Sequence, residues 1–254
     1  MVLDSELGRY LRKKGVTKTV WCDDDALFDP VKFPIAGLET HGAILFADLP
    51  GYSKLSQDLN PMECAYLTSH FFAWFEGSAG RSYGGIVDKF IGDEIMMVFV
   101  PSADGLAPLD AAMQTARAMI DKDHFGFRPK MGIAAGPLAI ALVGTERTYA
   151  ASATGNTVNL AARCCANTEG RHCVKVATSD VQRVKRVFDD GDSWRVSDSV
   201  QFTPKNMAPV QVVDVERLTE WIPNLDYLDK VKRTVKKAKA IGAIRKERKR
   251  ETSS

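Results

Sequence analysis

The first apolar run long enough for a buried strand is Gly42–Phe46, which ends just before Asp48. A short apolar run between polar residues is typical of such a strand. The segment Asn60–Glu63 reads NPME, which combines a capping asparagine, a first-turn proline and a glutamate three residues on. Apolar residues then recur at helical spacing to about Gly77. The pattern predicts a buried strand followed by a helix.

Downstream, two apolar-rich runs flank Gly92-Asp93-Glu94, and this arrangement is typical of a hairpin. The two runs are Ile86–Ile91 and Ile95–Val100. An amphipathic pattern predicts a second helix over Leu109–Ile120. Beyond it, Gly136-Pro137 separates two more apolar runs, which we expect to form another strand pair. These runs are Lys130–Ala135 and Leu138–Val143.

The last third of the chain is predicted to add smaller elements. A helix is expected over Thr157–Ala166, just after Gly155, and a basic helix from Tyr227 onward. Apolar runs predict three short strands, at Val174–Ala177, Trp194–Val196 and Val210–Val215. At the other end, residues 1–41 have weak periodicity, so we expect an irregular extension with a short helix near Ser5.

The central elements follow the order strand, helix, strand, strand, helix, strand, which is the ferredoxin-like arrangement. We therefore predict an α+β fold with additional elements, in which helices cover one face of a mostly antiparallel sheet. The chain divides into an N-terminal extension over 1–41, a central domain over 42–216 and a C-terminal tail over 217–254.

Charge sets the tail apart from the body. The chain has 34 Lys and Arg against 32 Asp and Glu, a net charge of +2. Residues 230–254 hold 11 of these bases and two of the acids, so this segment carries +9 and residues 1–229 carry −7. Such asymmetry is typical of an interaction tail. Three roles for the tail stay open: dimer packing, an anionic partner such as nucleic-acid backbone or a membrane surface, or solubility.

Several protein classes lack support in the sequence. A hydrophobic content of 45% fits a packed globule. There is no run of about 18 apolar residues, and the charged N-terminus does not match a signal peptide. The five cysteines match no CxxC spacing, so we expect reduced thiols in a cytoplasmic protein. The P-loop, GxSxG and HExxH motifs are absent.

Two carboxylates are the first candidates for chemistry. Asp48 ends the first strand and Asp93 lies at the tip of the hairpin. In a ferredoxin-like sheet that strand neighbours the hairpin, so both carboxylates are expected at one end of the sheet. Hard oxygen ligands without His or Cys suit Mg²⁺ or Mn²⁺. Taken singly, each residue is also explained by a strand end or a turn, where Asp is common.

Two further segments suit a phosphorylated ligand. The turn Gly51-Tyr52-Ser53 after Asp48 can offer backbone N–H groups to a phosphate. Asn159 and Arg163 are four residues apart on the expected helix, so they project from one face. An amide beside a planar guanidinium suits a ribose and a phosphate, although a solvated helix face explains Arg163 as well.

Three segments together resemble the signature blocks of class III nucleotidyl cyclases, in that family's order and spacing. They are ILFADLPGYSKLS (Ile44–Ser56), GGIVDKFIGDEIMMVF (Gly84–Phe99) and GNTVNLAARC (Gly155–Cys164). The resemblance covers roughly Gly42 to Val215. It implies a nucleotidyl cyclase that converts a nucleoside triphosphate to a 3′,5′-cyclic nucleotide and pyrophosphate with two divalent cations per site.

The resemblance also implies roles for individual residues. Asp48 and Asp93, helped by the Leu49 carbonyl, would hold Mg²⁺ or Mn²⁺. Asn159 would orient the ribose and Arg163 would stabilise charge on the phosphate under attack. The implied substrate contacts are Phe46, Tyr52, Lys89, Ser152 and Lys205. In this family each active site is shared between two catalytic domains, so a homodimer with two equivalent sites is expected.

The sequence departs from the family at base-reading and substrate positions. Lys89 matches a base-contacting position, but Ser152 stands where adenylyl members usually have Asp or Thr and guanylyl members Cys. Tyr52 replaces a frequent Phe, and Lys205 is the nearest match to a triphosphate-binding lysine. The chain resembles the bacterial pyrimidine cyclases of Pycsar anti-phage signalling, whose cyclic UMP or cyclic CMP activates a separate effector. An adenylate cyclase is the alternative, and an inactive nucleotide-binding scaffold is a further one.

Overall fold

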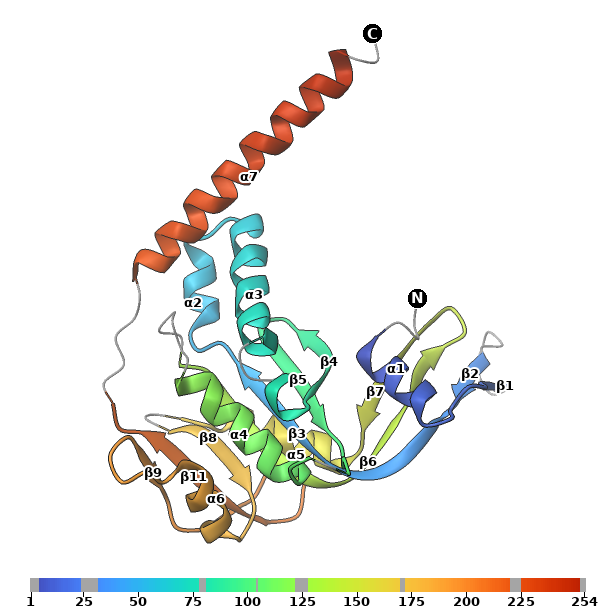
Figure 1. Ribbon diagram of the computed structural model, residues 1–254, viewed down its shortest axis with the longest axis vertical. Helices are drawn as coiled ribbons and strands as arrows, with labels where there is room; N and C mark the ends of the chain where they lie inside the picture. Colours follow the sequence, from blue (N-terminus) through green and yellow to red (C-terminus); the bar gives the residue numbers. More distant parts are fainter. Residues whose placement is uncertain are drawn as a thin grey trace.

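The computed structural model describes residues 5–23, 32–77, 81–103, 105–121, 128–169, 172–219 and 225–251. Within these ranges most strands join one large sheet (Figure 1). Its strands are β3 (Gly37–Asp48), β4 (Ile86–Ile91), β5 (Glu94–Phe99), β6 (Lys130–Thr145), β7 (Thr148–Thr154), β8 (His172–Ala177), β9 (Trp194–Val196), β10 (Val200–Phe202) and β11 (Val210–Arg217). The helices are α1 (Glu6–Lys13), α2 (Tyr52–Gln57), α3 (Pro61–Phe75), α4 (Pro108–Asp121), α5 (Asn156–Ala166), α6 (Val181–Phe188) and α7 (Leu225–Glu251), with a 3₁₀ turn at Arg81–Tyr83.

The sheet has the predicted ferredoxin-like centre. The order across it is β10-β11-β8-β6-β3-β5-β4, with β7 added to β6 and β9 to β11. The described pairings are antiparallel except that of β6 with β8. The elements β3, α3, β4, β5, α4 and β6 follow the predicted βαββαβ order, so the α+β fold is confirmed.

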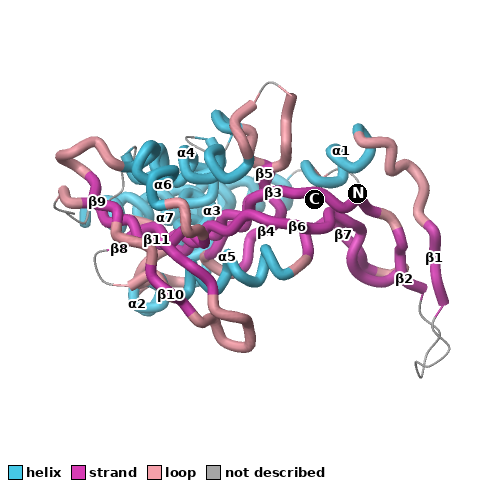
Figure 2. The backbone as a smooth tube through the Cα atoms, turned by 90° about the horizontal axis from the view of Figure 1, so that it is seen from below, coloured by secondary structure: helices cyan, strands magenta, loops and turns pink. Residues whose placement is uncertain are grey.

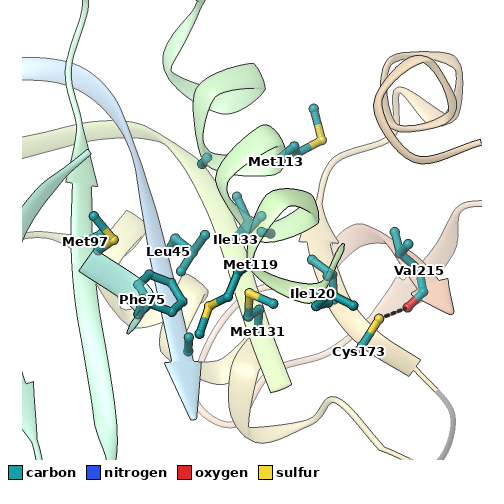
Figure 3. Close-up of a cluster of buried hydrophobic side chains, with 14 of the residues drawn as sticks. Leu45, Phe75, Met97, Met113, Met119, Ile120, Met131, Ile133, Cys173 and Val215 are labelled. Atoms are coloured by element: carbon teal, nitrogen blue, oxygen red, sulfur yellow. Dashed lines mark hydrogen bonds between the residues drawn. The ribbon is translucent and has the colours of Figure 1, made fainter. Parts of the chain in front are cut away.

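Both faces of the sheet are covered, which corrects the expectation of a single covered face. One apolar cluster joins α3, α4 and α6 to β3 residues such as Leu45, together with a group of methionines (Figure 3). The neighbouring β3 residues Ile44 and Phe46 face a second cluster, to which α1 and α5 contribute. Figure 2 shows α5 across the sheet from α4 and α6. Side chains alternate along a strand, so a strand buried on both sides reads as one unbroken apolar run.

Local sequence signals fix the start of α3 as predicted. The Asn60 side chain accepts hydrogen bonds from the N–H groups of Met62 and Glu63, and Glu63 accepts one from the Asn60 N–H. This reciprocal capping box satisfies N–H groups that the first helical turn leaves without partners. The helix then packs Leu67, Phe71 and other apolar residues on the sheet.

The predicted strand pair at 130–143 is wrong, because β6 continues through Gly136-Pro137. These residues pair with Gly42 and His41 of β3, so the ladder carries on across them. A side chain at Gly136 would meet Thr157 Oγ1 of α5 at 2.8 Å. The glycine therefore admits a helix close to the strand and does not mark a turn. The partner of β6 in its hairpin is β7, which the sequence did not predict.

The ends of the chain are more regular than expected. Residues assigned to an irregular extension form the expected short helix, α1, which Ser5 caps, and the two-stranded pair β1 (Val20–Asp23) and β2 (Lys32–Ile35). β3 begins at Gly37, five residues before the predicted strand. The predicted basic helix is confirmed as α7, which projects beyond α3 in Figure 1. Among the helices described, none is both long and apolar enough to cross a membrane.

Candidate active site

Two carboxylates meet at one end of the sheet, as the sequence predicts. Asp48 ends β3 and lies opposite Glu94 in the antiparallel register with β5, and Asp93 precedes Glu94 in the β4–β5 turn. The side chains of Asp48 and Asp93 lie close enough to interact electrostatically. Burial, and then the negative charge of Asp93, raises the pKa of Asp48 to about 6. We call Asp48 and Asp93 the acidic pair.

The acidic pair fits a divalent cation. Two carboxylates this close repel one another unless a proton or a cation lies between them. Their oxygens are the hard ligands that Mg²⁺ and Mn²⁺ prefer. Across the described residues, no group of three or more His, Cys, Asp or Glu side chains gathers to hold a metal. Such a site leaves most coordination positions for water and for substrate oxygens.

The residues near Asp48 in the sequence are held by local contacts. The Leu49 carbonyl, the third expected ligand, accepts the Tyr52 N–H at 3.2 Å and keeps a second lone pair. A hydrogen bond of 3.2 Å joins Tyr52 Oη to Thr68 Oγ1 of α3. Phe46 is 4% exposed and packs in the second apolar cluster. The Tyr52 hydroxyl is therefore anchored on α3, whereas Phe46, an expected substrate contact, lies in the core.

Lys89 and Ser152 are brought together from separate strands. Lys89 Nζ on β4 donates to Ser152 Oγ on β7 at 2.5 Å. Ser152 is 6% exposed, whereas Lys89 is exposed. The two residues that match the family's base-reading positions thus form one contact, which we call the Lys89–Ser152 pair. The sequence did not predict it, because β7 was not recognised as a strand.

A third group lies along α5. Asn159 and Arg163 are exposed on one face of the helix and line a cleft of about 520 Å³. Lys205 lines the same cleft, beside Asn206 in a left-handed conformation at φ 63°. The other lining residues are Glu94, Ala162, Ala166 and Met207. We call this the α5 cleft, and its described lining includes neither the acidic pair nor the Lys89–Ser152 pair.

A family model for the adenylate and guanylate cyclase catalytic domain matches residues 39–198, more than half of the chain. The chain belongs to this family. As a class III cyclase it carries the acidic pair, the Lys89–Ser152 pair, Asn159 and Arg163 inside the matched range, whereas Lys205 lies beyond it. Cyclases of this class generally use divalent metal ions, which agrees with the chemistry of the acidic pair.

Curated relatives and solved structures resemble this cyclase domain. Two uncharacterised proteins of Mycobacterium tuberculosis are 28% identical over 149 residues and 31% identical over 134 residues, which cover 58% and 52% of this chain. The matches span only 28% and 25% of those relatives' length.

Two solved structures share the fold at TM-scores of 0.59 and 0.58. The adenylyl cyclase CyaB from P. aeruginosa is 21% identical, and the match covers 74% of this chain and all of that one. A bacterial light-regulated adenylyl cyclase is 20% identical, with 79% of this chain and 58% of that chain covered.

The sequence analysis did not identify Asp88 as a site residue. In the structure, Asp88 contacts Ser152 of the Lys89–Ser152 pair. Its carboxylate accepts hydrogen bonds from Ser152 Oγ and from the Ala153 N–H, both at 3.0 Å. Burial raises the pKa of Asp88, while these two bonds and the charge of Lys89 oppose the rise. The sequence signal for Asp88 was its position directly before Lys89. Because β7 was not predicted, no hydrogen-bond partner could be assigned to the Asp88 carboxylate.

Two of the cysteines, Cys164 and Cys165 of α5, are fully buried. All five are unpaired, as predicted. Burial raises the pKa of Cys164 to about 12, and it raises the pKa of Cys165 as well. Thiols with such high pKa values are poor nucleophiles at neutral pH. Two residues of α5 that flank the catalytic candidates therefore serve packing.

Proposed function

We propose that the chain is an active nucleotidyl cyclase, which converts a nucleoside triphosphate to a 3′,5′-cyclic nucleotide and pyrophosphate. The observation that carries the proposal is the acidic pair at one end of the sheet. Burial and the charge of Asp93 raise the pKa of Asp48, and a bound cation would neutralise the repulsion between the two carboxylates. The presence of Asn159 and Arg163 in one cleft adds the groups that a ribose and a phosphate require.

The roles follow from the chemistry of the side chains. Asp48 and Asp93, with the Leu49 carbonyl, would hold Mg²⁺ or Mn²⁺. When bound, these cations lower the pKa of the ribose 3′-hydroxyl and neutralise charge on the leaving pyrophosphate. The 3′-hydroxyl gives its proton to solvent, its oxygen attacks the α-phosphorus, and the bond from that phosphorus to the oxygen bridging the β-phosphate breaks, so that pyrophosphate leaves. Arg163 supplies fixed positive charge where negative charge develops, Asn159 orients the ribose, and Lys205 binds the triphosphate.

The active form is a homodimer with two shared sites. The residues that line the α5 cleft include neither aspartate, although Glu94, which directly follows Asp93, is among them. A two-fold axis would place the acidic pair of one subunit against the α5 cleft of its partner, and the same operation generates the second site.

For the base, we favour a pyrimidine cyclase that makes cyclic UMP or cyclic CMP in bacterial anti-phage signalling, where a separate effector responds to the product. Ser152 supports this choice, because purine cyclases use Asp, Thr or Cys at this position and this chain has Ser. Adenylate cyclase is the second candidate, supported by Lys89, which stands where guanylyl cyclases carry Glu.

The test incubates purified protein with Mn²⁺ and ATP, GTP, CTP or UTP separately, and identifies cyclic products by chromatography. Cyclic product from a pyrimidine nucleotide, lost in Asp93→Asn, is the expected result. The matched control is Asp198→Asn, which changes an exposed aspartate outside the site and should keep full turnover. Product from ATP alone would overturn the base choice, and no product from any nucleotide would support an inactive scaffold.

A further inference from the structure

Asp88 sits at an irregularity in the strand that carries Lys89. Val87 pairs with Met97 and Lys89 pairs with Met96, so Asp88 is the extra residue of a β-bulge between β4 and β5. Bulges re-aim side chains and are frequent beside active sites. Consecutive residues of a regular strand point to opposite faces, whereas here Asp88 and Lys89 both contact Ser152. The bulge therefore turns two adjacent side chains toward one hydroxyl group.

The bulge is held from both sides. The Glu6 carboxylate of α1 accepts the Val87 N–H at 3.1 Å. On the other side, the Asp88 carboxylate accepts the Ala153 N–H and so joins β4 to β7, two strands with no ladder between them. The Asp88 side chain is 1% exposed, and its Oδ1 has no hydrogen-bond partner among the described residues. A buried carboxylate with an unpartnered oxygen is costly for folding alone, and such groups often have a functional reason.

The hydrogen bonds give the Ser152 hydroxyl one direction. A hydroxyl group has a single hydrogen and two lone pairs. The hydrogen of Ser152 is directed to the Asp88 carboxylate at 3.0 Å, a shorter contact than the competing one with the Ala153 carbonyl at 3.3 Å. One lone pair accepts from Lys89 Nζ. Ser152 therefore has one lone pair left for a ligand and no hydrogen to donate.

We propose that Asp88 is a specificity-determining positioning residue, which makes Ser152 an obligate hydrogen-bond acceptor beside the donor Lys89. This inference rests on the proposed cyclase function and deepens it. A serine alone does not select a base, since its hydroxyl can donate or accept. With Asp88 behind it, the Lys89–Ser152 pair presents one donor and one acceptor in fixed order. Cytosine and uracil carry donor and acceptor in opposite order on their pairing edges, as do adenine and guanine, so the fixed order separates the members of each couple.

The experiment measures kcat/KM for all four nucleoside triphosphates and reports their ratios. In Asp88→Ala the Ser152 hydrogen is freed, so discrimination within each couple should fall by about tenfold, the worth of one hydrogen bond. Asp88→Asn should keep the ratios of the original chain, because an amide oxygen can occupy the position of Oδ2. In a Ser152→Ala background, Asp88→Ala should leave the ratios unchanged, because the residue it acts through is gone.

The controls separate a positioning role from a structural one. Asp214→Asn changes another buried carboxylate, paired with Lys175 at 2.5 Å, and should lower stability without altering the ratios. If Asp88→Ala does not fold, Asp88→Leu fills the same space without polar atoms. Unchanged ratios in the Asp88 variant, or an equal change with and without Ser152, would overturn the inference.

Failure of the proposed function has a different signature. If the original chain cyclises none of the four nucleotides, the cyclase proposal fails by itself. The ratios are then read from calorimetric dissociation constants of non-hydrolysable analogues of the four nucleotides. The same loss of discrimination in Asp88→Ala is expected there, and its absence would reject the role of Asp88 independently of turnover.

Discussion

Replacing Asp48 by Asn should make the metal-free protein more stable while abolishing its activity. The reason lies in the acidic pair, where burial and the charge of Asp93 raise the pKa of Asp48 from 3.8 to about 6. A carboxyl group whose pKa is higher in the folded state holds its proton more tightly there. Its ionisation therefore costs stability, and this cost appears as the pH rises from about 4 through 6. Asparagine keeps the shape and carries no charge to bury.

The size of the effect follows from that difference in pKa. A rise of about 2 corresponds to about 3 kcal/mol at pH 8, at about 1.4 kcal/mol for each pH unit. Because Asp48 is only half-buried, solvent screening reduces this to about 1.5 kcal/mol. For a domain of this size, that is a rise of about 3–6 °C in melting temperature. At pH 5 about half of the gain should disappear, because the folded protein then protonates Asp48.

The assay is thermal unfolding in EDTA at pH 8 and at pH 5, with Asp198→Asn as the control for loss of an exposed charge. Added Mn²⁺ should raise the melting temperature of the original chain and leave that of Asp48→Asn nearly unchanged, because a cation stabilises only the state that binds it. A lower melting temperature for metal-free Asp48→Asn, or a gain of equal size at both pH values, would refute the electrostatic reasoning.

Three further outcomes are expected. Arg163→Ala should lower kcat by about 100-fold or more in steady-state assays, since it removes fixed charge at the reacting phosphate, and near-normal kcat would remove Arg163 from the mechanism. Mixing inactive Asp93→Asn with inactive Arg163→Ala should restore about a quarter of the activity, because half of the dimers then hold one intact site; no recovery after subunit exchange would exclude shared sites. Val231→Ala should cost about 2 kcal/mol in denaturant unfolding, since this α7 residue is fully buried, whereas deletion of 241–254 should leave both stability and turnover unchanged.

Much of the site was readable because its residues lie at ends of elements with strong local signals. Asp48 closes an apolar run, Asp93 lies in a glycine-led turn, and α5 begins just after Gly155, so each position follows from short-range pattern. The capping box at Asn60 is equally local. The acidic pair was then a matter of placing one strand beside one hairpin, which the ferredoxin-like order already required.

The missed features depend on contacts between distant segments. Gly136 indicates a turn by itself, and only the closeness of Thr157 explains a glycine within a continuous strand. Residues 150–153 read as a featureless alanine run, yet β7 forms there because β6 supplies its partner. Asp88 gains a role only from that pairing. A single sequence states what each residue is able to do, but not which remote backbone will lie against it.

The length of α7 determines how strongly its charges interact electrostatically with the rest of the chain. The helix is anchored on α3 by Tyr227, Val231 and Val235, with the Tyr227 and His70 rings 5.9 Å apart. From Val235 to Glu251 it continues for 16 residues, about 24 Å at 1.5 Å per residue. That is about three Debye lengths at physiological ionic strength. The positive charge at the far end of α7 is therefore screened from the acidic body, so that end of the helix can change its partners or its salt atmosphere with little effect on the acidic pair.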